Sequence, residues 1–257
     1  MPFKLSTISA ALTAVTRSAA STITIPGSKG ANYTLTKVKV IFFGTLETVV
    51  NGGTKVEVEN DSVDYKPFEF ITNYQTCVTS GGAPIKPTNI KCNKPLPAGS
   101  ILSLYFTPYS TASTKFAVTI EYEKRAFSGR PLRMQVATGT AVTATTKASD
   151  HLTWTIPSGK GGRAVSLILQ ALGTLETVVD SGGLVSLHTL SPGSIPWSPL
   201  DFYLGGATVG SCGGTIVEPE EVMLDGFDVE GQGIIYADYT PQDNQSQLLI
   251  GSLVWEG

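Results

Sequence analysis

The chain has 257 residues, with 18 Lys and Arg against 21 Asp and Glu and a formal net charge of −3. This charge argues against a specific nucleic-acid partner, because neutralising phosphates requires a clustered excess of Lys and Arg. Charged residues are only 15% of the chain, against about 25% in typical soluble domains. Two His and three Cys leave little material for multi-ligand zinc, iron–sulfur or haem sites.

The N-terminal segment, residues 1–10, precedes the repeated part of the chain, and we predict that it forms an arm. Residues 8–20 are the one helix-like stretch, but their Thr content makes them poor helix formers. Small residues near the end of this stretch would suit a signal-peptide cleavage site. Thr13, Thr16 and Arg17 interrupt it, and its counterpart in the second half lies in mid-chain, so we expect no signal peptide.

Apolar and polar residues alternate through residues 11–124. On the last predicted strand the apolar residues are Phe116, Val118, Ile120 and Tyr122. A period of two is typical of a half-buried strand. Other predicted strands cover residues 22–25, 34–43, 55–59, 68–71 and 101–106. Turn-forming sequences such as Asn51-Gly52-Gly53 separate these strands.

A short connector, residues 125–140, leads to a second copy of the same pattern in residues 141–257. The segment GTLETVVN at residues 44–51 recurs as GTLETVVD at residues 173–180, with seven identical positions. Shorter matches join residues 11–16 with 141–146, 25–26 with 156–157, 67–70 with 199–202, and 107–108 with 240–241. A repeat of this length indicates a duplicated domain, whereas solenoids and propellers repeat units of about 20–50 residues.

Predicted strands in the second copy cover residues 152–156, 164–171, 184–188, 202–204, 234–239 and 248–255. We find no amphipathic crossover helix that would connect parallel strands. Many short strands with turns at near-regular spacing favour a sandwich or jelly roll. The sequence therefore predicts an all-β protein with two tandem jelly-roll or β-sandwich domains related by internal duplication.

Neither histidine stands in a catalytic motif. His188 follows Val185 and Leu187 on a predicted strand and faces away from them, so we expect it at a solvated strand position. His151 follows Asp150, and a Ser could complete a hydrolase-like set, but no Gly-x-Ser-x-Gly elbow is present. We predict no catalytic residue and no enzymatic activity.

Other charged residues also lack the spacing of a binding site. Lys29 and Lys160 stand in Gly-rich turns without phosphate-loop spacing. Glu47 and Glu176 occupy the repeated segment, where a paired-carboxylate role is conceivable, but they belong to separate copies. The acidic run at residues 218–221 lacks the spaced loop of a calcium site. We therefore predict no cofactor-binding residue and no metal ligand.

The cysteines allow two interpretations. Cys77 and Cys92 flank a loop and could form a disulfide, which would leave Cys212 unpaired, or all three could be free thiols. Glycosylation tripeptides begin at Asn32, Asn60 and Asn244.

Two similar all-β domains of jelly-roll size, joined by a short connector and without enzymatic residues, resemble the double jelly-roll major capsid proteins of tailless icosahedral double-stranded DNA viruses. The resemblance covers residues 11–257 and rests on the duplication and the strand pattern. It implies that the two jelly rolls stand side by side and that three chains form a pseudo-hexameric homotrimer. The trimers would tile an icosahedral shell, with minor capsid proteins and an internal membrane as further partners.

The resemblance implies a virion location, with residues 1–10 toward the shell interior. The low charge agrees with it, because a shell subunit buries much of its side surface against neighbours. The alternative is an extracellular or cell-surface tandem β-sandwich protein, such as an adhesin, a filament or surface-layer subunit, or a carbohydrate-binding protein. Exposed aromatics on one sheet face, including Trp197 or Tyr203, would favour carbohydrate binding.

Overall fold

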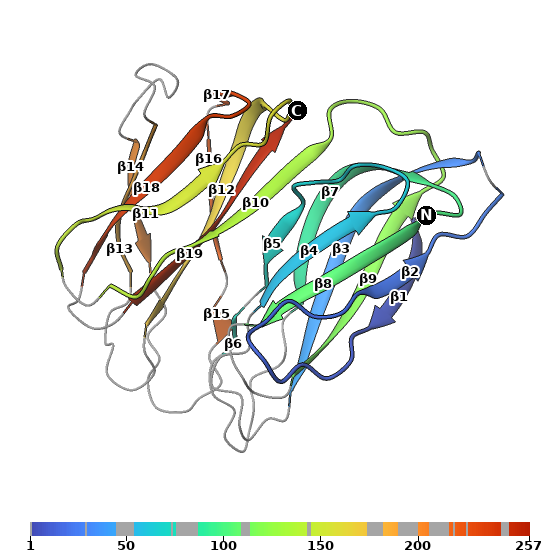
Figure 1. Cartoon of the computed structure of the whole chain (residues 1–257), viewed down its shortest axis with the longest axis horizontal. Coiled ribbons are helices and arrows are strands. Elements are labelled where there is room, and N and C mark those ends of the chain that lie inside the picture. The colour runs from blue at the N-terminus through green and yellow to red at the C-terminus, as the bar shows by residue number, and fades with distance from the viewer. Residues whose placement is uncertain are drawn as a thin grey trace.

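The computed structural model describes residues 2–28, 30–44, 54–72, 74–75, 87–108, 114–142, 145–173, 182–189, 200–205, 216–217, 219–224, 226–242 and 247–257. Every regular element in these ranges is a β-strand (Figure 1). Residues 9–20, part of the helix-like stretch, are irregular. Within the same ranges no helix is long and apolar enough to cross a membrane.

The first sandwich consists of two antiparallel four-stranded sheets. One sheet has the order β1 (Phe3–Ile8), β9 (Thr114–Glu123), β3 (Asn32–Gly44) and β7 (Thr88–Pro97). The other has the order β2 (Ser21–Thr24), β8 (Ile101–Pro108), β4 (Thr54–Asn60) and β5 (Glu69–Ile71). Each connection between these strands crosses from one sheet to the other, except the connection from β4 to β5. This strand order is that of a jelly roll.

The second sandwich repeats this order strand for strand. One sheet has the order β10 (Leu132–Thr138), β19 (Gln247–Glu256), β12 (Gly162–Gly173) and β16 (Glu220–Met223), and β17 (Asp228–Val229) also pairs with β12. The other has the order β11 (Ala148–Thr155), β18 (Ile234–Pro241), β13 (Gly182–Thr189) and β14 (Leu200–Gly205). A short ladder joins β6 (Tyr74–Gln75) to β15 (Ile216–Val217). The predicted fold class is thus confirmed.

Side-chain alternation explains how each sandwich closes. On β8 and β9 every second residue is buried, and the rings of Phe106 and Phe116 stack at 5.0 Å between the two sheets. In the second sandwich the largest buried side chains are Trp154, Trp255 and Tyr239. Removing these apolar faces from water is the main stabilising contribution to such a fold.

The first strand of each sandwich lies in a segment that we expected to be an arm or a connector. Strand β1, inside the expected arm, pairs with β9 from Phe3 opposite Tyr122 to Ile8 opposite Ala117. Strand β10, inside the expected connector, pairs in the equivalent way with β19. The sequence similarity between the two copies begins only at residues 11 and 141, after these first strands or within a few residues of them.

The two sandwiches lie side by side and share a packed junction (Figure 1). Strands β5 and β7, at one edge of the first sandwich, contact β10 of the second. The N–H of Met134 donates to the Pro67 carbonyl at 3.2 Å, and Arg133 Nη1 donates to the Lys66 carbonyl at 2.9 Å. Met134 and Val254 belong to the apolar core of the first sandwich, so the junction is continuous with that core.

Candidate functional site

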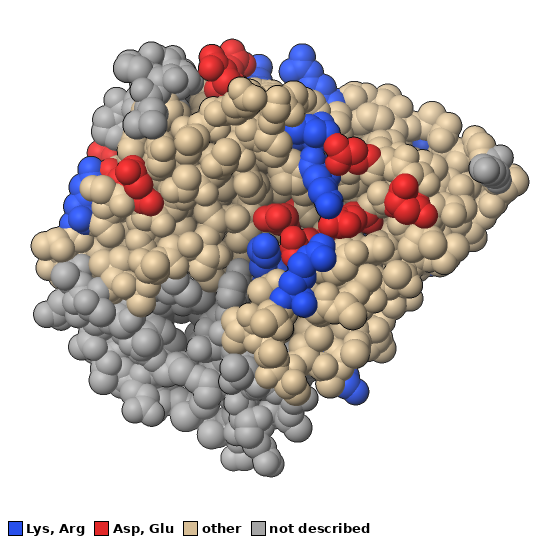
Figure 2. Space-filling model, in the orientation of Figure 1, with Lys and Arg blue, Asp and Glu red and all other residues tan. Residues whose placement is uncertain are grey.

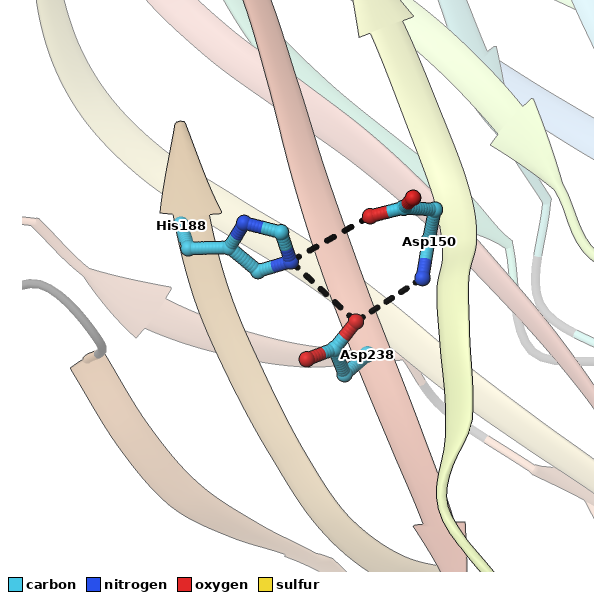
Figure 3. A group of neighbouring side chains, drawn as sticks. All are labelled: Asp150, His188 and Asp238. Carbon is cyan, nitrogen blue, oxygen red and sulfur yellow. Dashed lines mark hydrogen bonds and ion pairs between the residues drawn. The ribbon is translucent and has the colours of Figure 1, made fainter. Parts of the chain in front are cut away.

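Three side chains with metal-ligating atoms meet on the outer face of the second sandwich (Figure 3). Asp238 lies on β18, between β11, which carries Asp150, and β13, which carries His188. His188 is directly opposite Tyr236 in the strand register. Asp238 is two residues beyond Tyr236, and thus on the same face of the sheet.

A bulge in β11 brings Asp150 to the same place. Ala148 pairs with Tyr239 and Leu152 pairs with Ala237, so residues 149–151 stand opposite residue 238 alone. Asp150 has a φ of 50°, in the left-handed region that non-glycine residues rarely adopt. Its N–H donates to Asp238 Oδ1 at 2.8 Å. Bulges often redirect a side chain in this way beside functional sites.

Short polar contacts join the members of the group. His188 Nε2 lies 3.1 Å from Asp238 Oδ1 and 3.4 Å from Asp150 Oδ1, and Lys147 Nζ lies 2.5 Å from Asp238 Oδ2. The His188 ring stacks on Tyr236 at 5.5 Å. Burial acts to raise the pKa of Asp238, but the hydrogen bonds from Lys147, Asp150 and His188 outweigh it and hold the pKa below its ordinary value.

The two histidines have different surroundings. His188 is on the outward face, as expected, but it is half-buried and paired with two carboxylates. The ring of His151 instead packs on Tyr239 at 5.6 Å, and its Nε2 is buried without a hydrogen-bond partner. Burial lowers the pKa of His151. The hydrolase-like set of Asp150 and His151 therefore has no support in the arrangement of these two side chains.

Several other residues considered in the sequence have structural roles. Lys160 Nζ pairs with Asp64 of the first sandwich, and the Lys160 carbonyl accepts a 2.7 Å bond from the Trp255 indole. Asn60 Oδ1 accepts the N–H groups of the turn that follows it. Tyr203 is 72% exposed. Lys29, Glu47, Glu176, Glu218, Cys77, Cys212, Trp197 and Asn244 lie outside the described residues.

Cys92 is a buried free thiol, and burial raises its pKa to about 12. It is therefore not part of a disulfide with Cys77. A thiol with this pKa is almost entirely protonated at neutral pH and is a poor nucleophile.

Lys94 is another buried titratable group, and nothing in the sequence pattern indicated its burial. It stands on the inward face of β7 and is 1% exposed. Its Nζ donates to the Tyr65 carbonyl at 3.2 Å and lies 4.6 Å from the centre of the Phe68 ring. Burial lowers the pKa of Lys94 to about 7.

Charged side chains gather in a band at the junction of the sandwiches, while most of the same face is uncharged (Figure 2). A cleft of about 560 Å³ lies there, lined by Arg17, Glu57, Glu59, Lys66 and Glu69 together with apolar neighbours. Arg17 bridges Glu57 at 2.9 Å and Glu59 at 3.0 Å. Burial raises the pKa of Glu69, which stands directly opposite Glu57 in the register.

No family model and no curated protein matches the chain. Among solved structures, PNGase F, a glycosylasparaginase from Flavobacterium meningosepticum, is similar with a TM-score of 0.49 and 10% identity, over 99% of this chain and 96% of that one. The major capsid protein P2 from bacteriophage PM2 is similar with a TM-score of 0.42 and 9% identity, over 99% and 98%. PNGF-II gives a TM-score of 0.44 at 9% identity over 93% of this chain, which spans 59% of its length. The similar structures thus include both a capsid protein and an enzyme.

Proposed function

We propose that the chain is a major capsid subunit that assembles, as pseudo-hexameric homotrimers, into an icosahedral shell. The observation that supports this most is the presence of two jelly rolls of one strand order, side by side in one chain. Because the shared junction joins them into one block, three chains around a threefold axis would present six similar modules. Closed rotational symmetry of this kind is the usual form of soluble homo-oligomers.

The order of strands across the molecule supports a head-to-tail ring. Inside the chain, the β5 and β7 edge of the first sandwich meets β10, the first strand of the second. The corresponding far edges are β14 and β16 at one end and β1 at the other. Contact between β16 of one copy and β1 of the next would repeat the internal junction, so one type of contact would serve all six positions.

Both far edges carry exposed apolar side chains. Phe3 and Ile8 on β1 are 42% and 65% exposed, and Met223 on β16 and Tyr203 on β14 are 68% and 72% exposed. Unpaired edge strands with exposed apolar residues are ready to associate with another chain.

The oligomeric state of the purified chain tests this proposal. Size-exclusion chromatography with light scattering should give three times the 27.1 kDa of one chain or larger, and negative-stain microscopy should show trimers or shells. A monodisperse monomer across several salt concentrations and pH values would contradict the proposal. Monomers that bind glycans on an array would instead support the tandem adhesin or carbohydrate-binding alternative, with the junction cleft as the place to search.

A further inference from the structure

Asp150, His188 and Asp238 bring three electron-pair donors to one point on β11, β13 and β18 (Figure 3). The three donor atoms, one imidazole nitrogen and two carboxylate oxygens, lie within 4.8 Å of one another. His188 Nε2 has a carboxylate oxygen at 3.1 Å and a second at 3.4 Å. The group combines an aromatic nitrogen ligand with two acids, so its chemistry differs from that of an acidic surface patch.

One proton does not satisfy this arrangement. Nε2 carries at most one hydrogen, which can point well at only one of the two carboxylate oxygens. With the proton on Nδ1 instead, three electron-rich atoms would face one another. Lys147 balances one of the two carboxylate charges through Asp238 Oδ2, at 2.5 Å. A cation placed among the three donor atoms would accept all three lone pairs, and the remaining carboxylate charge would attract it.

The backbone and the neighbouring ring hold the donors in place before any ion arrives. The bulge and the left-handed conformation of Asp150, with φ 50°, direct its carboxylate toward His188. The stack on Tyr236 fixes the His188 ring. Asp238 is 5% exposed and receives the Asp150 N–H. A non-glycine residue in this conformation costs free energy, and such strain clusters at ligand sites.

We propose that Asp150, His188 and Asp238 bind a single divalent transition-metal ion of the Zn²⁺ class. Tetrahedral bonds of about 2.0–2.1 Å place neighbouring ligand atoms about 3.3–3.4 Å apart, and the 3.1 and 3.4 Å separations at Nε2 match this spacing. An imidazole ligand favours Zn²⁺ over Mg²⁺ and Ca²⁺, which prefer oxygen ligands only. Water would fill the fourth position, and the ion would join three neighbouring strands.

Isothermal titration of the full chain with Zn²⁺ tests the site. We expect one equivalent bound by the wild type. His188→Gln removes the imidazole ligand but still offers amide hydrogens to both carboxylates. Asp150→Asn removes one carboxylate ligand, and asparagine tolerates the left-handed backbone at this position. Each should reduce affinity by more than the roughly 10–100-fold typical of losing an outer-shell partner. His151→Gln, which removes the other histidine, should bind like the wild type.

Thermal unfolding gives an independent measurement. Zn²⁺ at about 100 times its Kd should raise the wild-type Tm by roughly 5–10 °C and leave the two ligand variants nearly unchanged. Circular dichroism of the metal-free proteins establishes that the variants are folded. No binding by the folded wild type, or equal binding by wild type, His188→Gln and Asp150→Asn, would overturn the site; equal binding would assign the ion to cysteine thiols or another surface.

Discussion

Lys94 occupies a position where a charged amine is costly. Its environment on the inward face of β7 favours the neutral form, so its pKa is about 7 in the folded chain against an ordinary value of 10.5. Between these two pH values the unfolded state binds more protons than the folded state. The free energy of unfolding therefore rises with pH through this window, and below pH 7 the cost of burying the charge is fully present.

This linkage predicts the behaviour of Lys94→Met. Between pH 7 and pH 10 the wild type should gain stability relative to the variant, by an amount on the order of a few kcal/mol. Urea unfolding at both pH values measures the difference. Lys91→Met, on the exposed face of the same strand, is the matched control and should follow the wild type. Parallel pH profiles for wild type and Lys94→Met would show that the folded chain does not depress this pKa.

The sequence did not reveal the group of Asp150, His188 and Asp238. Asp150 and Asp238 are 88 residues apart, and His188 and Asp238 are 50 apart, so no local spacing joins them. Their meeting depends on the register of three strands and on a bulge. The alternation pattern predicts only that His188 faces outward, and it gives no signal for Asp238, because the apolar residues of that strand define the pattern.

At the scale of elements, period-two alternation was sufficient for most strands of both sandwiches. It identified β4, β8 and β9 because one face of each is apolar and the other polar. Strand β10 does not show this alternation. Met134 faces the first sandwich while Ala137 packs in the second core, so this strand is buried on both sides and its alternation is weak. Strand order across the sheets could not be predicted from periodicity.

The stack of Phe106 on Phe116 connects the two sheets of the first sandwich, and its loss should be costly. Phe116 is fully buried, and Phe→Ala substitutions in cores typically cost about 3–5 kcal/mol. We expect Phe116→Ala to lower the free energy of unfolding by that amount in urea titrations. Lys115→Ala, at the neighbouring exposed position, should stay within about 0.5 kcal/mol of the wild type. If Phe116→Ala changed the free energy of unfolding only slightly, contacts other than this stack would hold the two sheets together.

At the scale of the whole molecule, the two far edges determine how copies would meet. Ile8→Asp on β1 and Met223→Asp on β16 each place a charge at a position that the proposed ring would bury. Both variants should remain folded, because these side chains are 65% and 68% exposed, and both should elute as monomers in light scattering. Ile101→Asp, on the inner strand β8, should still assemble. Trimers in both edge variants would rule out the head-to-tail contact.

Because the junction is packed, the connecting peptide contributes little to holding the two sandwiches together. Met134 and Val254 complete the apolar core of the first sandwich, and the Met134 N–H is bonded to the Pro67 carbonyl. Pulling the halves apart would therefore open that core to water, whether or not the chain is continuous between residues 124 and 131. A single proteolytic cut in this segment would therefore leave the two halves of the molecule associated. Under force the two sandwiches should unfold as one unit, although the sequence contains two copies of the domain.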